Sequence, residues 1–167
     1  MTIDTLEQAF YTRKAGSADV VDIINKGVNG DLYELILKFQ FISFNSFLAE
    51  INNPEKLYAF YVCRDRNDDL IGWACCFKFH ERLGYSGSVQ LVMDLYKPIS
   101  ALGWENYLYQ SCEEECRRRG AHVIVSFVHS NMKQLMDWHH DNAFEACGNI
   151  DLVSADKMHV FSKRLPK

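Results

Sequence analysis

The stretch VQLVMDLYKPISALGWENYLYQSCEEECRRRGAHVIVSFV, residues 89–128, contains the pattern of a strand, a helix and a second strand. Its first seven residues are mostly apolar, as in a strand of a sheet. The helix is expected to follow Gly103 and to end at Gly120, since a glycine after three arginines is typical of a helix C-terminus. Residues 121–128 are nearly all apolar, which indicates a buried strand. This order predicts a parallel βαβ crossover.

Further elements are expected on both sides of this unit. Before it, the sequence predicts a strand at 10–14, a helix from the N-cap Ser17 to about 26, a second helical region at 30–52, and a hairpin of strands 57–63 and 70–79. After it, the sequence predicts a helix at 132–142, a turn at 143–148, and strands at 150–153 and 158–164. We interpret residues 1–167 as a single domain with a mixed α/β architecture.

Charge and hydropathy argue against several classes of partner. The 167 residues carry a net charge of −4 without a basic stripe, so nucleic acid is not expected to bind. The start of the chain lacks the pattern of a secretory signal, and charged residues interrupt the apolar segment 30–52. We therefore expect a soluble, cytoplasmic protein that does not bind a membrane.

The six cysteines lie mostly within apolar segments, where reduced thiols are the common state. Cys112 and Cys116 are four residues apart and would share one helix face, which could in principle hold a metal. No second pair has the spacing of a zinc site. Reduced core thiols and no metal are expected.

Several motifs in this order resemble those of one enzyme family. Residues 79–85, FHERLGY, are similar to its F-R-x-R-x-x-Y loop, and Ser88-Val89-Gln90 to its T-V-E strand. The segments EEECRRRGAHVIVSFVHSN and WHHDNAFEACG are similar to its A-x-x-x-G helix end, strand and Asn, and then to L-H-x-x-x-G-F-x-x-x-G. With these motifs the chain resembles the GNAT superfamily of N-acetyltransferases, especially the phosphinothricin acetyltransferase-like group.

The resemblance implies a GNAT-like acyl-CoA N-acyltransferase fold, with a mostly antiparallel sheet, one parallel βαβ crossover and helices on both faces. It also implies an acetyl-CoA-dependent N-acetyltransferase that transfers the acetyl group directly to the amine of a small molecule, with acetyl-CoA as co-substrate. The sequence leaves open whether the protein forms a homodimer. The alternative is a catalytically degenerate domain of the same fold that binds a ligand or a protein partner.

The family holds the coenzyme A diphosphate in a turn R/Q-x-x-G-x-G/A, and only one of its marked positions is kept here. By resemblance the turn consists of Ser100, Ala101, Leu102, Gly103, Trp104 and Glu105. Backbone N–H groups and the helix N-terminus behind them would still attract a diphosphate. The Glu105 carboxylate would compete with the diphosphate unless it points elsewhere. An ordinary helix start with Ser100 as N-cap and a buried Trp104 is the alternative.

The resemblance also implies roles in catalysis. Gln90 occupies the position of the family's Glu base and cannot accept a proton, so Asp94, on the same strand face, is the substitute candidate, acting through a water. His139 matches a position near the coenzyme sulfur and would protonate the thiolate. The alternatives are a strand-end carboxylate and an ordinary helix histidine. The backbone from Asp94 through Leu95 to Tyr96 would hold the pantetheine and the thioester oxygen.

The remaining candidates would bind the two substrates. Asn131 matches the family's Asn that helps to hold the pantetheine arm, although it could simply cap the next helix. Arg82 and Tyr85 match the loop beside the acceptor pocket, where Gln90 could position a substrate, although Arg82 could also be a solvated loop residue. Aromatic side chains could line the pocket's other side or form core or dimer contacts: Tyr33, Phe39, Phe41, Phe44 and Phe47.

Overall fold

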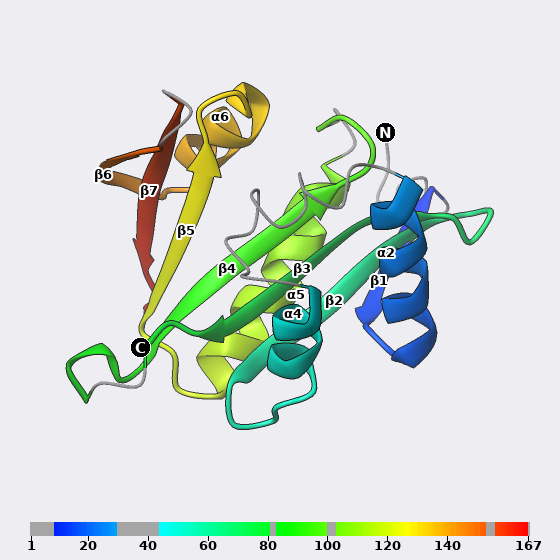
Figure 1. Cartoon of the computed structure of the whole chain (residues 1–167), viewed down its shortest axis with the longest axis horizontal. Coiled ribbons are helices and arrows are strands. Elements are labelled where there is room, and N and C mark those ends of the chain that lie inside the picture. The colour runs from blue at the N-terminus through cyan, green and yellow to red at the C-terminus, as the bar shows by residue number, and fades with distance from the viewer. Residues whose placement is uncertain (1–8, 30–43, 81–82, 100–102, 153–155, 167) are drawn as a thin grey trace.

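The computed structural model describes residues 9–29, 44–80, 83–99, 103–152 and 156–166. In these residues one sheet of seven strands has the order β1-β2-β3-β4-β5-β7-β6 (Figure 1). The strands are β1 (Phe10–Lys14), β2 (Leu57–Asp65), β3 (Leu70–Lys78), β4 (Ser88–Leu95), β5 (Val123–His129), β6 (Glu145–Asp151) and β7 (Lys157–Arg164). The helices are α2 (Ser17–Asn29), α4 (Phe44–Ile51), α5 (Trp104–Arg118) and α6 (Lys133–Asp141), with a 3-10 turn at Leu83–Tyr85.

The pairing of the strands agrees with the expected architecture. The β4–β5 pair is parallel and is connected through α5, while the other neighbouring pairs are antiparallel. The hairpin of β2 and β3 lies at the centre of the larger half of the sheet, and β3 is buried along nearly its whole length. The predicted mixed sheet with one βαβ crossover is therefore confirmed.

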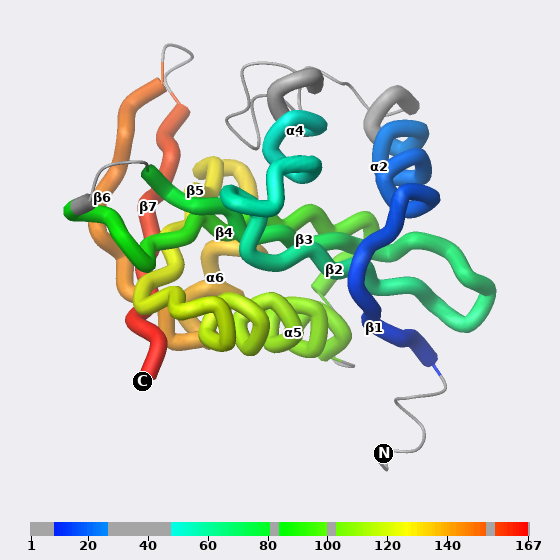
Figure 2. The backbone as a smooth tube through the Cα atoms, turned by 90° about the horizontal axis from the view of Figure 1, so that it is seen from below, coloured from blue at the N-terminus to red at the C-terminus, as the bar shows by residue number. Residues whose placement is uncertain are grey.

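Helices cover both faces of the sheet. Figure 2 shows α2 and α4 on one face and α5 on the other. The alternation along β4 follows this division, because Val89, Leu91 and Met93 belong to the core beneath α5, whereas Val92 belongs to the core beneath α2 and α4. Asp94 therefore lies on the α2 and α4 face.

Close packing fixes α5 on β3. A Cβ atom at Gly72 would lie 2.7 Å from the Trp104 ring, so the glycine permits the indole to lie directly on the strand. Cys112 and Cys116 share the buried face of α5, and Cys112 donates to the carbonyl of Ala74 at 3.4 Å. All six cysteines are free, and Cys147 is the exposed one.

An ion-pair network ties α2 to the first two strands. Asp19 is 1% exposed and accepts hydrogen bonds from Arg13, from Arg64 and from the Gly16 N–H. Burial alone would raise the pKa of Asp19, but these donors outweigh it and lower the pKa to about 2. Val20 N–H bonds to the Gly16 carbonyl, so Gly16 is the N-cap and the predicted cap Ser17 is the first helical residue.

The end of α5 follows the predicted pattern. Gly120 has a φ of 84°, and its N–H bonds to the Arg117 carbonyl at 2.9 Å. Arg118 pairs with Glu115 on the same helix. The Arg119 guanidinium instead leaves the helix and donates to the carbonyls of Pro54 at 2.9 Å, Leu57, and Tyr58 at 3.3 Å.

One predicted boundary is wrong. The segment 143–148 was expected to turn, but β6 begins at Glu145 and pairs with β7 up to Asp151. The register shifts between Ala146 and Gly148, and Gly148 has a φ of 146°. Gly148, the glycine that suggested a turn, therefore lies in a β-bulge.

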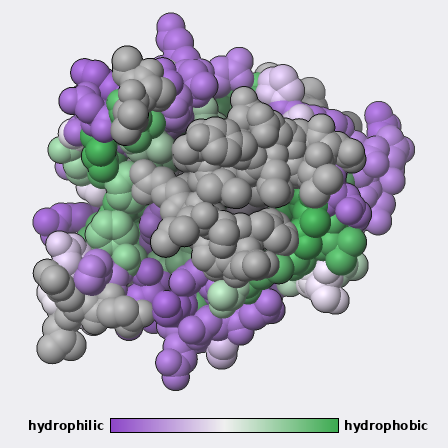
Figure 3. Space-filling model, viewed as in Figure 1, coloured by the Kyte–Doolittle hydropathy of each residue, from purple (hydrophilic) through white to green (hydrophobic). Residues whose placement is uncertain are grey.

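The surface is mixed in hydropathy. Figure 3 shows hydrophilic residues around most of the rim, with hydrophobic surface over α2 and over the strands β5 to β7. Val21 on α2 is 53% exposed, and Ile150 on β6 is 46% exposed. Within the described residues, no helix has the length and apolar character needed to span a bilayer.

Candidate acyl-transfer site

The sheet opens between β4 and β5. Their pairing runs from Ser88 with Val123 to Leu91 with Ser126 and goes no further. Beyond it β4 continues to Leu95 beside β3, β5 continues to His129 beside β7, and the two strands diverge (Figure 1). The last residues of β4 thus have one hydrogen-bonding edge that faces an opening in the sheet.

A cavity of about 470 Å³ lies at this opening. One side comes from the end of β4 and the residues after it, Met93 and 95–99, and the other from the start of α6 and the loop before it, 131–135. Apolar side chains dominate: Met93, Leu95, Pro98, Ile99, Met132 and Leu135. Two lysines, Lys97 and Lys133, also line it.

The predicted pantetheine-binding residues converge on this cavity. Leu95 and Tyr96 line it from β4, and Asn131 lines it from the opposite side. Asn131 also donates its backbone N–H to Nδ1 of His129 at 3.3 Å. Met132, not Asn131, is the N-cap of α6, so Asn131 does not cap the helix.

The predicted diphosphate turn is described only from Gly103 onward, and Ser100, Ala101 and Leu102 lie outside the described residues. Gly103 is the N-cap of α5 with φ 68° and ψ 23°, a left-handed conformation that favours glycine. A Cβ atom there would have only an ordinary contact, 3.5 Å from the Asn106 amide nitrogen. The conformation, and not a shortage of space, therefore favours this glycine.

Glu105 is turned toward the strands. It is 2% exposed, and its charge contributes to a raised pKa of Cys63 on β2, where burial is the larger cause. Trp104 is also buried, against Gly72. The two side chains therefore pack inside the molecule and leave the backbone at the start of α5 uncovered by either of them.

Asp94 and Gln90 lie on the sheet face opposite α5. Asp94 is 4% exposed and pairs in register with Trp73 of β3. Gln90 is half-buried between Phe77 of β3 and Val125 of β5. Asp94 is thus the carboxylate that β4 carries to the opening of the sheet.

His139 is placed inside the protein, which argues against its predicted role as proton donor. Its Nδ1 bonds to the Leu135 carbonyl at 2.7 Å, and its Nε2 to the Ser126 hydroxyl at 2.8 Å. Because a carbonyl only accepts, Nδ1 carries the proton and Nε2 accepts from Ser126. Burial lowers the pKa of His139 to about 4. The ring supports the cavity wall at Leu135 and has no free proton for a thiolate.

The predicted acceptor side carries an aromatic cluster. Tyr85 is 43% exposed and lies 5.6 Å from the Phe79 ring and 5.2 Å from the His80 ring, measured between centroids. Phe79 stacks in turn on Phe127 of β5 at 6.2 Å. The neighbours of Phe127 on β5, Ser126 and Val128, are buried, so Phe127 lies on the same face as Gln90. Arg82 lies outside the described residues, as do Tyr33, Phe39 and Phe41.

Solved bacterial structures resemble nearly the whole chain. The protein yncA from Salmonella typhimurium, solved with its cofactor acetyl-CoA, has 16% identity and a TM-score of 0.73, covering 95% of each chain. A GNAT superfamily phosphinothricin acetyltransferase from Sinorhizobium meliloti, in complex with acetyl-CoA, has 17% identity and a TM-score of 0.71 over 94% of this chain and 89% of that chain. The ribosomal-protein-alanine N-acetyltransferase from Brucella melitensis has 20% identity and a TM-score of 0.69 over 93% and 99%.

The chain has the GNAT acetyltransferase fold. The fold predicted from the sequence motifs is therefore confirmed. No protein-family model matches the sequence, and no curated protein matches it at a significant level.

Sequence reasoning missed most of the other residues that line the GNAT-fold cavity, among them Lys97, Met132 and Lys133. Lys97 follows β4 and forms an ion pair with Asp65 at 2.7 Å. Met132 and Lys133 start α6. Nothing in their local pattern marks them, because they meet β4 only after the βαβ unit has folded.

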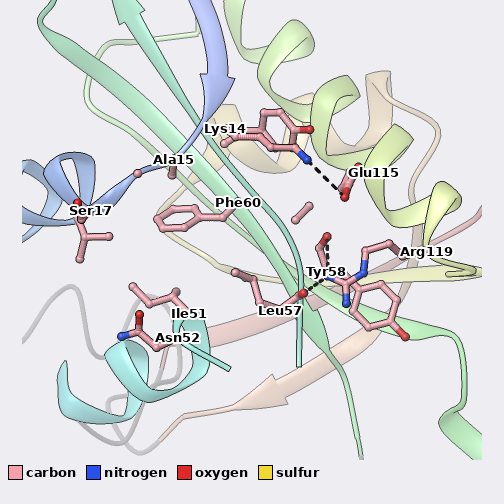
Figure 4. A pocket seen from close by; sticks show the side chains of 14 residues that line it. Lys14, Ala15, Ser17, Ile51, Asn52, Leu57, Tyr58, Phe60, Glu115 and Arg119 are labelled. Carbon is pink, nitrogen blue, oxygen red and sulfur yellow. Dashed lines mark hydrogen bonds and ion pairs between the residues drawn. The ribbon is translucent and has the colours of Figure 1, made fainter. Parts of the chain in front are cut away.

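A second cavity, of about 350 Å³, lies beside the first half of β2 (Figure 4). Its walls come from the loop after β1, the end of α4, the start of β2 and the end of α5. The Lys14 ammonium lies 3.7 Å from the Glu115 carboxylate at its rim, and Arg119 covers Tyr58. It holds none of the residues predicted for acyl transfer.

Among the described residues, no group of three or more His, Cys, Asp or Glu side chains is placed to hold a metal ion. Cys76, Cys112 and Cys116 lie together in the core, and burial contributes to a raised pKa at each of the three thiols. Protonated thiols are poor metal ligands.

Proposed function

We propose that this protein is an acetyl-CoA-dependent N-acetyltransferase that transfers the acetyl group directly to the amine of a small molecule. The observation that carries the proposal is the parting of β4 and β5 beyond Leu91 and Ser126, with the cavity at the opening. Two proteins of the same fold, from Salmonella and Sinorhizobium, were solved with acetyl-CoA. A cytoplasmic location and a homodimer stay predictions.

The cavity suits the coenzyme in shape and chemistry. Its apolar side chains can contact the pantetheine arm, and the free edge of β4 offers backbone hydrogen-bonding groups along it. Lys97 and Lys133 supply positive charge for the phosphates. The position where the family's turn has Arg or Gln is Ser100 here, which carries no charge. The burial of Glu105 removes the competing carboxylate from the front of α5.

Acetyl-CoA supplies the thioester, and the protein must handle the proton of the amine. Gln90 cannot accept it, and His139 is already engaged by Leu135 and Ser126. Asp94 remains, at the end of β4 where the sheet opens. A positioned carboxylate is expected to accelerate such a step by about 100-fold to 10,000-fold.

The acceptor would approach from the face of α2 and α4. Gln90, Tyr85, Phe79 and Phe127 lie there, on the same side of the sheet as Asp94. Aromatic rings attract an ammonium group or contact an apolar body, and the Gln90 amide can donate or accept a hydrogen bond. These groups fit a small amine with an apolar part.

Calorimetric titration of the purified protein with acetyl-CoA, and with coenzyme A alongside, tests the proposal first. We expect micromolar binding of both, followed by release of free thiol when a panel of small amines is added. Binding without acetyl transfer to any amine would favour the degenerate domain. No binding of either compound would reject both the enzyme and the coenzyme site.

A further inference from the structure

The end of β5 leads directly into the wall of the first cavity. β5 pairs with β7 as far as His129 with Met158, and residues 131–135 line the cavity. Between the strand and the helix lies a turn, 129–132, which is closed by the Met132 N–H donating to the His129 carbonyl at 2.9 Å. Met132 is also the N-cap of α6. The position of this turn therefore determines where α6 begins beside the cavity.

The His129 side chain closes the same turn a second time. Its Nδ1 accepts a hydrogen bond from the Asn131 backbone N–H at 3.3 Å. Because a backbone N–H can only donate, Nδ1 carries no proton here and the ring proton is on Nε2. Nε2 lies 3.7 Å from the carboxylate of Asp156, the residue directly before β7. Each ring nitrogen of His129 therefore faces a polar group of the protein itself.

The hydrogen bond from Asn131 to the His129 ring has the pattern of an Asx turn. In such a turn the side chain of residue i, usually Asn or Asp, accepts the N–H of residue i+2. Here the imidazole of His129 performs this role for the N–H two residues further along the chain. An asparagine at position 129 is therefore expected to form the same turn, whereas an apolar side chain cannot.

Separate contacts hold the two central residues of the turn. The Ser130 N–H donates to the Lys157 carbonyl at 2.8 Å, and the Lys157 N–H donates to the Ser130 hydroxyl at 3.3 Å. Ser130 is thus held by the start of β7, whereas Asn131 is held by the His129 ring. The first contact fixes the turn to the sheet, and the second fixes the residue that faces the cavity.

The His129 ring supports the cavity wall from behind. Its neighbour on the strand, Val128, belongs to the core beneath α5, so His129 lies on the other face of the sheet with Phe127. Its side chain is 16% exposed, and it does not belong to the cavity lining. His129 can therefore act on a ligand in the cavity only through the residues that it holds, Asn131 and Met132.

We propose that His129 is a positioning residue of the coenzyme site: its ring holds Asn131, and with it Met132, at the wall opposite Leu95 and Tyr96. The proposal rests on the proposed function. A gap of about half an ångström already removes roughly a quarter of the attraction between two atoms in contact. A wall that is fixed before the ligand arrives also lowers the cost of ordering on binding. The affinity for the coenzyme, and not the chemical step, therefore depends on His129.

The first test compares two substitutions of the ring. His129→Leu removes the acceptor, and we expect Kd and KM for acetyl-CoA to rise about fivefold to tenfold while kcat stays within about twofold. His129→Asn keeps an acceptor for the N–H of residue 131 and should stay within about twofold of the parent. His159→Leu, on β7 opposite Val128, is the matched control and should keep the parent affinity. An equal loss in both His129 variants, or a loss in neither, would overturn the proposal.

A measurement without coenzyme separates this proposal from the proposed function. Hydrogen exchange of the Asn131 backbone N–H, followed by ¹⁵N NMR, should be faster in His129→Leu than in the parent and return to the parent rate in His129→Asn. The Met132 N–H, which bonds to the His129 carbonyl in every variant, is the reference. Equal exchange at Asn131 in all three proteins would overturn the role of His129. If the exchange follows the expected pattern but the parent binds no acetyl-CoA, the proposed function fails and the hydrogen bond within the turn stands.

Discussion

The two cavities both form where neighbouring strands part, but different groups meet the exposed backbone. At the second cavity, β1 leaves β2 after Ala15 bonds to Phe60, and Arg119 then donates to the carbonyls of Leu57 and Tyr58. At the first cavity, β5 leaves β4 and the walls are formed largely by apolar side chains. These cannot satisfy backbone groups, so the backbone of β4 remains available to a ligand.

A gap in the sheet is therefore not by itself a binding site. The Arg119 guanidinium donates the hydrogen bonds that a neighbouring strand would otherwise donate to the edge of β2. Its charge also lies 5.0 Å from the centre of the Tyr58 ring. The opening beside β4 has instead a lining suited to a long, flexible ligand with a charged end. Substitutions at equivalent places in the two cavities should therefore have unequal effects.

The strongest change is predicted for the wall of the first cavity, which His139 supports. The pKa of His139 is about 4 in the folded protein and 6.5 for an ordinary histidine. The unfolded chain therefore binds a proton here below about pH 6.5, while the folded protein does not until about pH 4. Stability should be complete above pH 6.5 and fall by about 3 kcal/mol on acidification to pH 4, at about 1.4 kcal/mol per unit.

His139→Gln should remove this part of the pH dependence, because an amide can bond to Leu135 and Ser126 without titrating. Urea unfolding at several pH values between 4 and 7.5 measures it. The exposed neighbour offers the control, since His140→Gln should keep the slope of the parent. An equal slope in all three proteins would mean that His139 is not buried as a neutral ring.

The second prediction closes each cavity in turn. Met132→Trp should weaken acetyl-CoA binding at least about a hundredfold, roughly 2.7 kcal/mol, because the indole would occupy the space between α6 and β4. Asn52→Trp places the same ring at the rim of the second cavity and should leave the affinity within twofold. Calorimetry on both variants decides the comparison. A reversed result would place the coenzyme at the second cavity.

The sequence allowed prediction of the parts of the fold that depend on local chemistry. The bounds of β1 were correct, and Gly120, which was predicted to end α5, has the positive φ typical of a helix C-terminus. Residue order along the βαβ unit, together with the family motifs, was enough for the topology. The start of β6 was wrong, since Gly148 lies in a bulge and not in a turn.

The site was harder to predict because it depends on contacts between distant segments. His139 matched a family position, but the partners that occupy its ring, Ser126 and Leu135, became known only from the structure. Asp94 was correctly assigned to the Gln90 face of its strand, yet its neighbour across the sheet, Trp73 of β3, became known only from the register of the strands. Periodicity identifies the face of a strand but not the partner across it.

The third prediction exchanges charge at the two cavities. Lys133→Glu should weaken acetyl-CoA binding about tenfold, roughly 1.4 kcal/mol, since a cation at the mouth becomes an anion facing the phosphates. The loss should shrink as salt is added. Lys14→Glu makes the same change at the second cavity, where Lys14 pairs with Glu115, and should not alter coenzyme affinity. Equal losses in both variants would indicate a general charge effect and not a phosphate contact.

The smallest expected effect tests what closes the second cavity. Arg119→Ala removes the donor to the carbonyls of Pro54, Leu57 and Tyr58, and these groups can then bond to water because the site is exposed. The expected loss of stability is therefore only about 1 kcal/mol, measured by urea unfolding. Arg118→Ala, which removes an exposed pair with Glu115 on the same helix, should cost less. If Arg119→Ala gives the second cavity a measurable affinity for acetyl-CoA, the guanidinium is what separates the two gaps in function; if it does not, the apolar lining of the first cavity is the deciding difference.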